Sequence, residues 1–342
     1  MNYQLDDFYD FAAASASIVV TYAPLLSVYL EQKLDQLIQE RVGGKQGHKQ
    51  LLSFTENGDV TYSLIHSEGP RSARLAVREG SLEVEEAVLR VQGIICKAIL
   101  PPRRKQIRRS GDQNTVRYLQ QSFTLTGCGS QTFQSATESA YAIAEMFSRQ
   151  EDDMMPWAPA TFQDGPALET SNRLFTYQGR NGRHVPVNIN RNLDPHGSLS
   201  RLAGTEFVHT EDNTVQYFKG THLQTGGISY KTADPATFKP GDIVEAQCSF
   251  IMLPNRGGHH SMKVIIRALT MLDDKYSKEA NITRMKAGVM LPATICQSGA
   301  SLPARRKVGY EADDEKEDII ENVNKGVKKM RVDEGDRDHK MQ

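Results

Sequence analysis

The densest group of chemically active side chains in this sequence is basic. Five cations fall within the seven residues RRKQIRR, and they are Arg103, Arg104, Lys105, Arg108 and Arg109. A guanidinium group pairs with two phosphate oxygens at once, and neighbouring cations gain affinity by displacing the counterions of a nucleic acid. Arg117 and Tyr118 follow on a segment that alternates like a strand. Single-stranded nucleic acids are bound by basic surfaces that carry aromatic rings. The five cations, together with Arg117 and Tyr118, therefore form the candidate nucleic-acid site.

Two other interpretations of the basic cluster stay open. Short Lys/Arg-rich runs act as nuclear import signals, and a solvated loop carries charge without any ligand. Shorter basic runs at residues 305–307 and 328–331 suit a split import signal. The net charge of -1 gives no general attraction for nucleic acid, so any attraction is local. The expected partner is DNA or RNA, the alternative is a protein, and the expected location is nuclear or cytoplasmic.

A second candidate site is the polar segment Pro254–Ser261, which the sequence predicts to lie between two strands. It holds an Asn, two Gly and two His after the Pro, so it is too long for a two-residue turn and is expected to project. The residues expected to meet a partner are Asn255, Arg256, His259 and His260. The alternative function is therefore a protein–protein interaction module that makes no contact with nucleic acid.

The residue types that catalysis needs occur without the spacing that would join them. The histidines show no HxH or HExxH spacing for a metal, and Cys128 and Ser130 lack the GxSxG context of a nucleophile. The four cysteines are far apart and form no CxxC pair, which indicates reduced core residues of an intracellular protein. The sequence contains no run of about 18 apolar residues, so no membrane span is predicted. No catalytic residue, metal or cofactor is expected, and the protein is expected not to be an enzyme.

The elements that would position these residues are clearest in the stretch Lys239–Asp273. Pro240-Gly241 suits a turn. Over residues 244–252, and again over 262–268, apolar side chains alternate with polar ones, which is the period of a half-buried strand. The sequence thus predicts an antiparallel hairpin of two long strands.

Residues 1–150 are predicted to form an α+β domain in which helices alternate with β-hairpin elements. Apolar residues at helical spacing predict three amphipathic helices, at residues 24–42, 81–100 and 137–149. Asn57-Gly58 between two apolar runs indicates a hairpin turn. Alternation predicts a strand over residues 116–126.

The rest of the chain is predicted to form a second domain and a tail. Residues 151–173 are rich in Pro and indicate an interdomain linker. Residues 174–275 carry repeated strand and turn patterns, which predict a small antiparallel β domain of the barrel or sandwich type. About half of the residues beyond 298 are charged, so residues 276–342 are expected to be largely disordered. The predicted fold class is α+β, with an N-terminal mixed helix and β-hairpin domain before the small β domain.

Several strings within residues 174–275 stand out, namely FVHTEDN, GDIVE and VIIRALTMLD. In these strings the chain resembles a set of uncharacterised fungal proteins from basidiomycetes. The resemblance covers about a third of the chain. It implies a fungal origin and a domain boundary near residue 174, and it implies no activity, ligand or catalytic residue.

Overall fold

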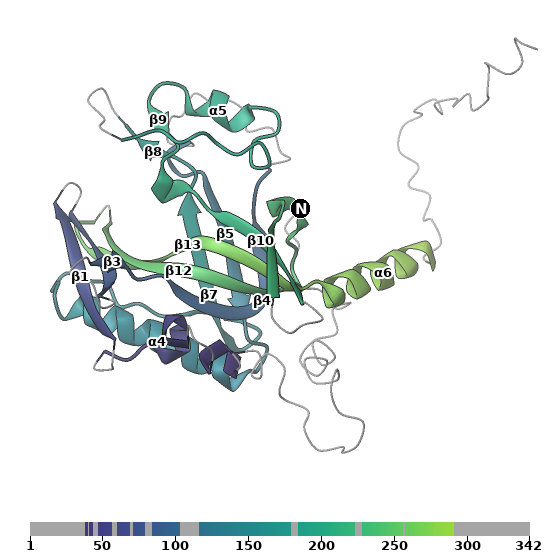
Figure 1. Ribbon diagram of the computed structural model, residues 1–342, viewed down its shortest axis with the longest axis horizontal. Coiled ribbons are helices and arrows are strands. Elements are labelled where there is room, and N and C mark those ends of the chain that lie inside the picture. The colour runs from purple at the N-terminus through teal and green to yellow at the C-terminus, as the bar shows by residue number, and fades with distance from the viewer. Residues whose placement is uncertain are drawn as a thin grey trace, which may run out of the picture. The chain divides into compact units, whose positions relative to one another are not determined.

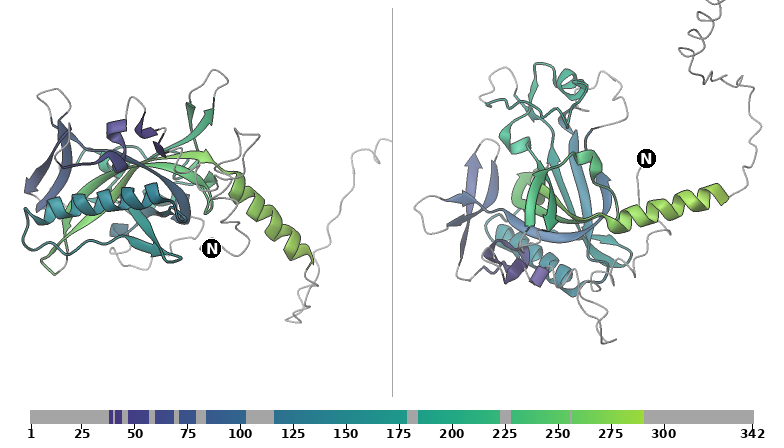
Figure 2. Two further views of the ribbon diagram at one scale, coloured as in Figure 1. Left: turned by 90° about the horizontal axis from the view of Figure 1, so that it is seen from below. Right: turned by 45° about the vertical axis from the view of Figure 1, so that its right-hand side comes forward.

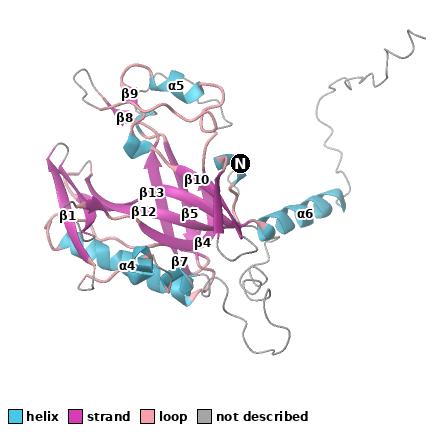
Figure 3. Ribbon diagram, in the orientation of Figure 1, coloured by secondary structure: helices cyan, strands magenta, loops and turns pink. Residues whose placement is uncertain are grey.

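The protein is mostly β-structure. The computed structural model describes residues 38–39, 41–43, 47–56, 60–68, 71–78, 84–102, 116–178, 184–222, 228–255 and 257–290. They belong to one compact unit that ends at Leu291. The named elements of this part of the chain comprise thirteen strands and the helices α4 (Gln131–Ser148), α5 (Ser198–Ala203) and α6 (Lys275–Met290) (Figure 3).

The strands differ widely in length, and the two longest are adjacent in sequence. Their bounds are β1 Thr61–Glu68, β2 Arg71–Arg78, β3 Glu85–Glu86, β4 Leu89–Ile99, β5 Gln120–Thr126, β6 Ala160–Phe162, β7 Gly165–Arg173, β8 Thr176–Tyr177, β9 Phe207–Val208, β10 Gln216–His222, β11 Ile228–Thr232, β12 Ile243–Pro254 and β13 His260–Asp273. Short 3-10 helices lie at η1 Gly47–Lys49, η2 Leu51–Ser53, η3 Glu211–Asn213 and η4 Pro235–Thr237.

Eleven of the strands form one sheet, and five of these close into a ring (Figure 1). Strand β4 pairs with β5 and with β12, and β5 pairs with β7. Strand β13 then pairs antiparallel with β12 and parallel with β7, which completes the ring β4-β5-β7-β13-β12. The hairpins β1–β2 and β10–β11 extend the sheet from β12 and β13, and β8 pairs separately with β9.

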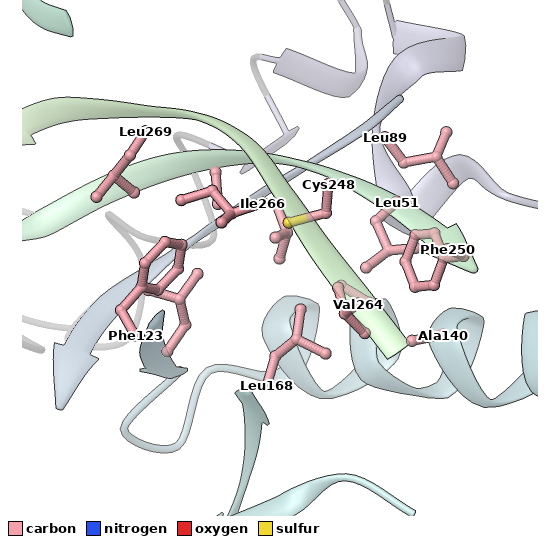
Figure 4. Close-up of a cluster of buried hydrophobic side chains, with 14 of the residues drawn as sticks. Leu51, Leu89, Phe123, Ala140, Leu168, Cys248, Phe250, Val264, Ile266 and Leu269 are labelled. Atoms are coloured by element: carbon pink, nitrogen blue, oxygen red, sulfur yellow. The ribbon is translucent and has the colours of Figure 1, made fainter. Parts of the chain in front are cut away.

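Apolar side chains from all five strands fill the inside of the ring (Figure 4). One fully buried or nearly buried example from each strand is Leu89, Phe123, Leu168, Phe250 and Ile266. Burial of each such side chain contributes roughly 1.5–3 kcal/mol. The alternation read from residues 244–252 exists because every second side chain of β12 enters this core.

Helix α4 packs against this core on one side of the sheet (Figure 1 and Figure 2). Its buried face includes Phe133, Ala140 and Phe147. Ser130 caps the helix by accepting a hydrogen bond from the backbone N–H of Phe133 at 3.1 Å. Gly93 of β4 allows the close approach, because a Cβ there would lie 3.0 Å from Cε2 of Phe133.

The predicted α+β fold class is wrong. Strands β4 and β5 come from the predicted N-terminal helix and hairpin domain, yet they complete one ring with β12 and β13, so there is no separate small barrel or sandwich over residues 174–275. The segment 151–173, predicted as a linker, contains β6 and β7. Of the predicted tail, residues 276–342, the structure describes only residues 276–290, which belong to α6. Residues 291–342 lie outside the described residues.

Individual elements were predicted with mixed success. The hairpin within Lys239–Asp273 is confirmed by the antiparallel pairing of β12 with β13. The helix predicted at 81–100 is wrong, because these residues form β3 and β4. The strand predicted at 116–126 begins at residue 120, and the helix predicted at 137–149 begins earlier, as α4. The β1–β2 pairing brings Glu68 opposite Arg71, so that hairpin does not turn at the predicted Asn-Gly pair, which lies outside the described residues.

Candidate functional site

The ring has an outer face on β4, β5, β7 and β13 whose middle is made of short polar side chains. One row crosses the four strands in direct register, and it consists of Ile99, Ser122, Ser171 and Ile265. Thr124 lies two residues from Ser122 on the same side of β5. The alternate residues of these strands, such as Phe123 and Leu168, fill the inside of the ring. Ser122 is buried, so the hydroxyl groups that the outer face presents are those of Thr124 and Ser171, which are half-buried.

Three cations surround this row. Lys97 pairs in register with Thr124, Arg173 pairs with Gln120, and Lys263 lies two residues before Ile265 on β13. All three cations are exposed, and none of them forms an ion pair with a described carboxylate. The outer face, as the term is used below, comprises Lys97, Ile99, Ser122, Thr124, Glu169, Ser171, Arg173, Lys263 and Ile265. It holds three cations against one carboxylate, so it favours anions.

Three aromatic side chains and one arginine lie near the start of β5, and they are called the tyrosine cluster below. The members of this cluster are Arg117, Tyr118, Tyr177 and Phe207. The guanidinium carbon of Arg117 lies 5.7 Å from the centroid of the Tyr177 ring, within the range of a cation–π contact. Phe207 meets the same ring edge-on, with centroids 5.4 Å apart. Tyr118 and Tyr177 remain 48% and 51% exposed, so about half of each side chain faces solvent.

A small second core holds the tyrosine cluster beside the outer face. This core consists of Leu119, Leu174, Phe175, Leu199 and Phe207. The backbone N–H of Leu174 donates to the carbonyl of Leu119 at 2.9 Å, which joins the start of β5 to the end of β7. Tyr177 in β8 pairs in register with Phe207 in β9. Arg173 of the outer face and Tyr177 are therefore attached to the same short stretch of backbone.

The string FVHTEDN forms a turn that supports this arrangement. The side-chain oxygen of Asn213 accepts from the backbone N–H and hydroxyl of Thr210, at 3.0 and 2.9 Å, and from the hydroxyl of Thr176 at 3.0 Å. Nδ1 of His209 donates to the carbonyl of Leu174 at 2.8 Å. The side chains of His209, Thr210 and Asn213, from the string that carried the resemblance, thus fix β8 and β9.

Asp212, from the same turn, joins an ion-pair network that includes Arg267, which lies two residues after Ile265 on β13. Its two carboxylate oxygens accept from Arg74 at 3.0 and 2.9 Å, and its backbone carbonyl accepts from Arg267 at 2.8 Å. Arg267 also meets Glu86 at 2.7 Å. The hydrogen bond from Arg74 holds the pKa of Asp212 below its ordinary value, against the effect of burial. These arginines are neutralised within the protein, whereas Lys97, Arg173 and Lys263 of the outer face are exposed and open to a ligand.

The structure describes only part of the predicted nucleic-acid site. Arg103–Arg109 lies outside the described residues, in the connection between β4 and β5. Arg117, at the end of that connection and next to Tyr118 in the chain, contacts the ring of Tyr177, which sequence reasoning missed. Lys97 and Arg173 were missed as well. For Lys263, the outward position on its strand was readable from alternation, but its place near β7 was not, because β7 is distant in sequence.

The predicted partner loop is shorter and more constrained than expected, because β12 and β13 both extend into it. Asn255 and His259 are exposed, and the backbone N–H of Asn255 donates to the carbonyl of His259 at 2.7 Å. Arg256 lies outside the described residues. His260 is 6% exposed, and its backbone is hydrogen-bonded to residues 153–155. The side chain of His260 is therefore withdrawn from the surface that a partner would reach.

A cavity of about 430 Å³ lies at the N-terminus of α4. Its lining includes Gly127, Cys128, Ser130, Phe133, Phe162 and Asp164. Burial raises the pKa of the Cys128 thiol to about 11, so the thiol is protonated at neutral pH. The described residues that line the cavity include no histidine, lysine or arginine. It therefore offers neither a base that would activate the thiol nor a side-chain cation that would hold an anion.

Comparison of the chain with protein-family models and with curated proteins gave no match. Within the described ranges, no helix is long and apolar enough to cross a membrane. The same part of the chain contains no group of three or more His, Cys, Asp or Glu side chains that could hold a metal ion. The function therefore has to be argued from the outer face and the tyrosine cluster.

Proposed function

We propose that this protein is a non-enzymatic nucleic-acid-binding protein whose ligand lies across the outer face, with phosphates held by exposed cations. The observation that carries the proposal is the group of exposed cations around the hydroxyl groups of the outer face. The order of the five strands in the ring gives supporting evidence. Counted along the chain, β4, β5, β7, β12 and β13 are the first to the fifth ring strands. Around the ring they follow the order first, second, third, fifth, fourth, with the third and fifth parallel.

This order is that of the OB-fold, a five-stranded Greek-key barrel. OB-folds bind oligonucleotides and oligosaccharides on the face of their second and third strands and with the loops after the first and fourth strands. In this chain, the second and third strands are β5 and β7, which carry the middle of the outer face. The loop after the first strand contains Arg103–Arg109, and the loop after the fourth contains Asn255–His259. Both segments that the sequence singled out therefore fall on loops that bind ligand in that fold.

A shared strand order is an analogy, and a fold alone does not define a function. The connections also differ, since α4 joins the second and third ring strands and residues 174–242 are inserted before the fourth. Independent support comes from the residues themselves. Hydroxyl groups and cations contact phosphate oxygens in nucleic-acid complexes, and the outer face offers Ser171 and Thr124 between Lys97, Arg173 and Lys263.

The alternative of a protein–protein module has less support in the described residues. Its site was the loop between β12 and β13, where His260 is buried and the described chain is a tight connection. A nuclear location belongs to the proposal, and it is supported by Arg103–Arg109 and by the basic runs at 305–307 and 328–331. Imaging of a fluorescent fusion before and after replacement of these runs tests the location.

Binding of short oligonucleotides at increasing salt tests the proposed function. We expect wild-type protein to bind at low salt and to lose affinity as salt rises, because counterions are released on binding. The test variant combines Lys97→Gln, Arg173→Gln and Lys263→Gln. For a single-stranded ligand it should lower the slope of log affinity against log salt by about 2, since each phosphate contact contributes about 0.7.

The matched control removes the same charge away from the outer face. It combines Lys219→Gln, Lys275→Gln and Lys278→Gln, all exposed residues at or near the base of α6. The control should keep the wild-type salt slope. If wild-type protein binds neither single-stranded nor double-stranded oligonucleotides at low salt, the proposed function is wrong.

A further inference from the structure

We infer that the ligand is single-stranded and that an unpaired base stacks on Tyr177. This inference rests on the proposed function, and it concerns which state of the nucleic acid the site selects. The outer face alone does not distinguish single strands from duplexes, because cations and hydroxyl groups contact the phosphates of both. The tyrosine cluster supplies the distinction.

Tyr177 is presented as a fixed and half-open ring. Its backbone is paired with Phe207 in the β8–β9 sheet, and its ring is braced by the edge contact with the Phe207 ring. The guanidinium of Arg117 lies over the ring, while 51% of the side chain stays exposed. An aromatic ring that is already immobilised loses little entropy when a ligand stacks on it. The exposed part of Tyr177 is therefore suited to receive a flat apolar surface.

Chain segments near Tyr177 carry further exposed apolar side chains. Tyr118, next to Arg117 in the chain, is 48% exposed, and Val185 and Val187 are 77% and 41% exposed. The backbone N–H of Val187 donates to the carbonyl of His209 at 2.7 Å, which holds this segment beside β9. The Tyr177 ring itself is in contact with a cation, Arg117. The matching ligand is therefore flat, apolar on its faces and attached to negative charge.

A nucleobase in a single strand has these properties, and a base in a duplex does not present them. In a duplex each base is paired and stacked on its neighbours, so its faces are hidden from a protein ring. In a single strand the base is free to turn out onto an aromatic side chain while its phosphate stays on a basic surface. Arg173 of the outer face lies only a few residues before Tyr177. The chain thus combines a phosphate contact with a stacking surface over a short distance.

The test compares an oligothymidylate with an abasic oligonucleotide of the same length, which carries the same phosphates without bases. We expect wild-type protein to bind the oligothymidylate at least about fivefold more tightly, the lower limit for one stacked base. Tyr177→Leu should remove this preference and leave the affinity for the abasic ligand unchanged. Tyr177→Phe keeps the ring and should keep the preference. Tyr141→Leu, which removes a similarly exposed tyrosine from α4, should behave as wild type.

The outcomes separate this inference from the proposed function. If wild-type protein binds neither ligand, the proposed function fails. If it binds both ligands equally, nucleic-acid binding by charge stands and stacking is refuted. A Tyr177→Leu variant that weakens both ligands by the same factor would assign the residue a structural role, which also refutes stacking. If Tyr177→Leu instead changes the oligomeric state in sedimentation, the tyrosine cluster is an interface between copies of the chain and the inference is overturned.

Discussion

Asp242 shows how a single buried carboxyl group links an element to the sheet. It lies in the turn before β12 and is 1% exposed. Its carboxylate accepts from the backbone N–H of Lys239 at 2.7 Å and from the hydroxyl of Ser277 in α6. Burial raises the pKa of Asp242 to about 6, and the bond from Ser277 is the largest of the opposing effects. The attachment of α6 therefore depends on a group that titrates near neutral pH.

The raised pKa of Asp242 predicts a specific pH dependence of stability. The folded protein binds this proton more tightly than the unfolded chain, so the contribution of Asp242 is fully present below about pH 4 and is lost as pH rises through about 6. A shift from 3.8 to about 6 corresponds to about 3 kcal/mol. Asp242→Asn should remove that decline. The measurement is the free energy of unfolding in urea, compared between wild type and variant across this pH range.

Two further variants control for this interpretation. Asp164→Asn changes an exposed carboxyl group in the β6–β7 turn and should leave the pH profile as in wild type. Ser277→Ala removes a hydrogen bond that favours the ionised form, so it should raise the pKa of Asp242 further. The loss of stability between low and high pH should then be larger than in wild type. Identical pH profiles for wild type and Asp242→Asn would refute the assignment.

At the scale of elements, the close contact between α4 and the end of β5 can be tested by adding one methyl group. A Cβ at Gly127 would lie 2.6 Å from Cβ and 2.7 Å from Cγ of Phe133. Cβ of Phe133 is bound to the helix backbone, so it cannot swing away without moving α4. We expect Gly127→Ala to destabilise the protein by roughly 1–3 kcal/mol, as overpacking does. Thermal and urea unfolding measure the loss.

Gly165→Ala is the matched control for this contact. A Cβ at that position would meet the carbonyl of Phe162 at 3.5 Å, an ordinary van der Waals distance. Its effect should stay within about 0.5 kcal/mol. Equal stability of Gly127→Ala and wild type would mean that α4 does not approach β5 as closely as the structure has it.

A strand with polar residues on its outward face was readable from the sequence, and a strand with apolar residues on both faces was not. Both β12 and β4 are largely buried on both faces. The outward residues of β12 include Glu245, Gln247 and Ser249, so its sequence alternates clearly. In β4 the adjacent residues Ile94 and Ile95 are both buried, which breaks the alternation, and periodicity alone cannot separate such a strand from a helical stripe. The β-branched residues of β4 were the signal that favoured a strand.

The site was less predictable than the elements because it is assembled from distant parts of the chain. The row across the outer face joins Ile99, Ser122, Ser171 and Ile265. Nothing local in the sequence specifies that β7 lies between β5 and β13, since this pairing is decided by how the whole core closes. Arg117 and Tyr118 were found because they follow a dense basic run. Tyr177 has no comparable local pattern, and it meets Arg117 where the end of β7 is joined to the start of β5 through Leu174 and Leu119.

For the whole molecule, the closed ring predicts that the described part of the chain unfolds in one step. Strand β12 uses one edge to pair with β4 and the other to pair with β13, so residues 174–275 taken alone would expose an unpaired edge and the buried side chains of Phe250 and Cys248. We expect a single calorimetric transition whose enthalpy equals the van't Hoff value. We also expect the isolated fragments 1–150 and 174–275 to lack cooperative unfolding. Two separate transitions, with one reproduced by fragment 174–275, would instead mean that this segment is an independent domain.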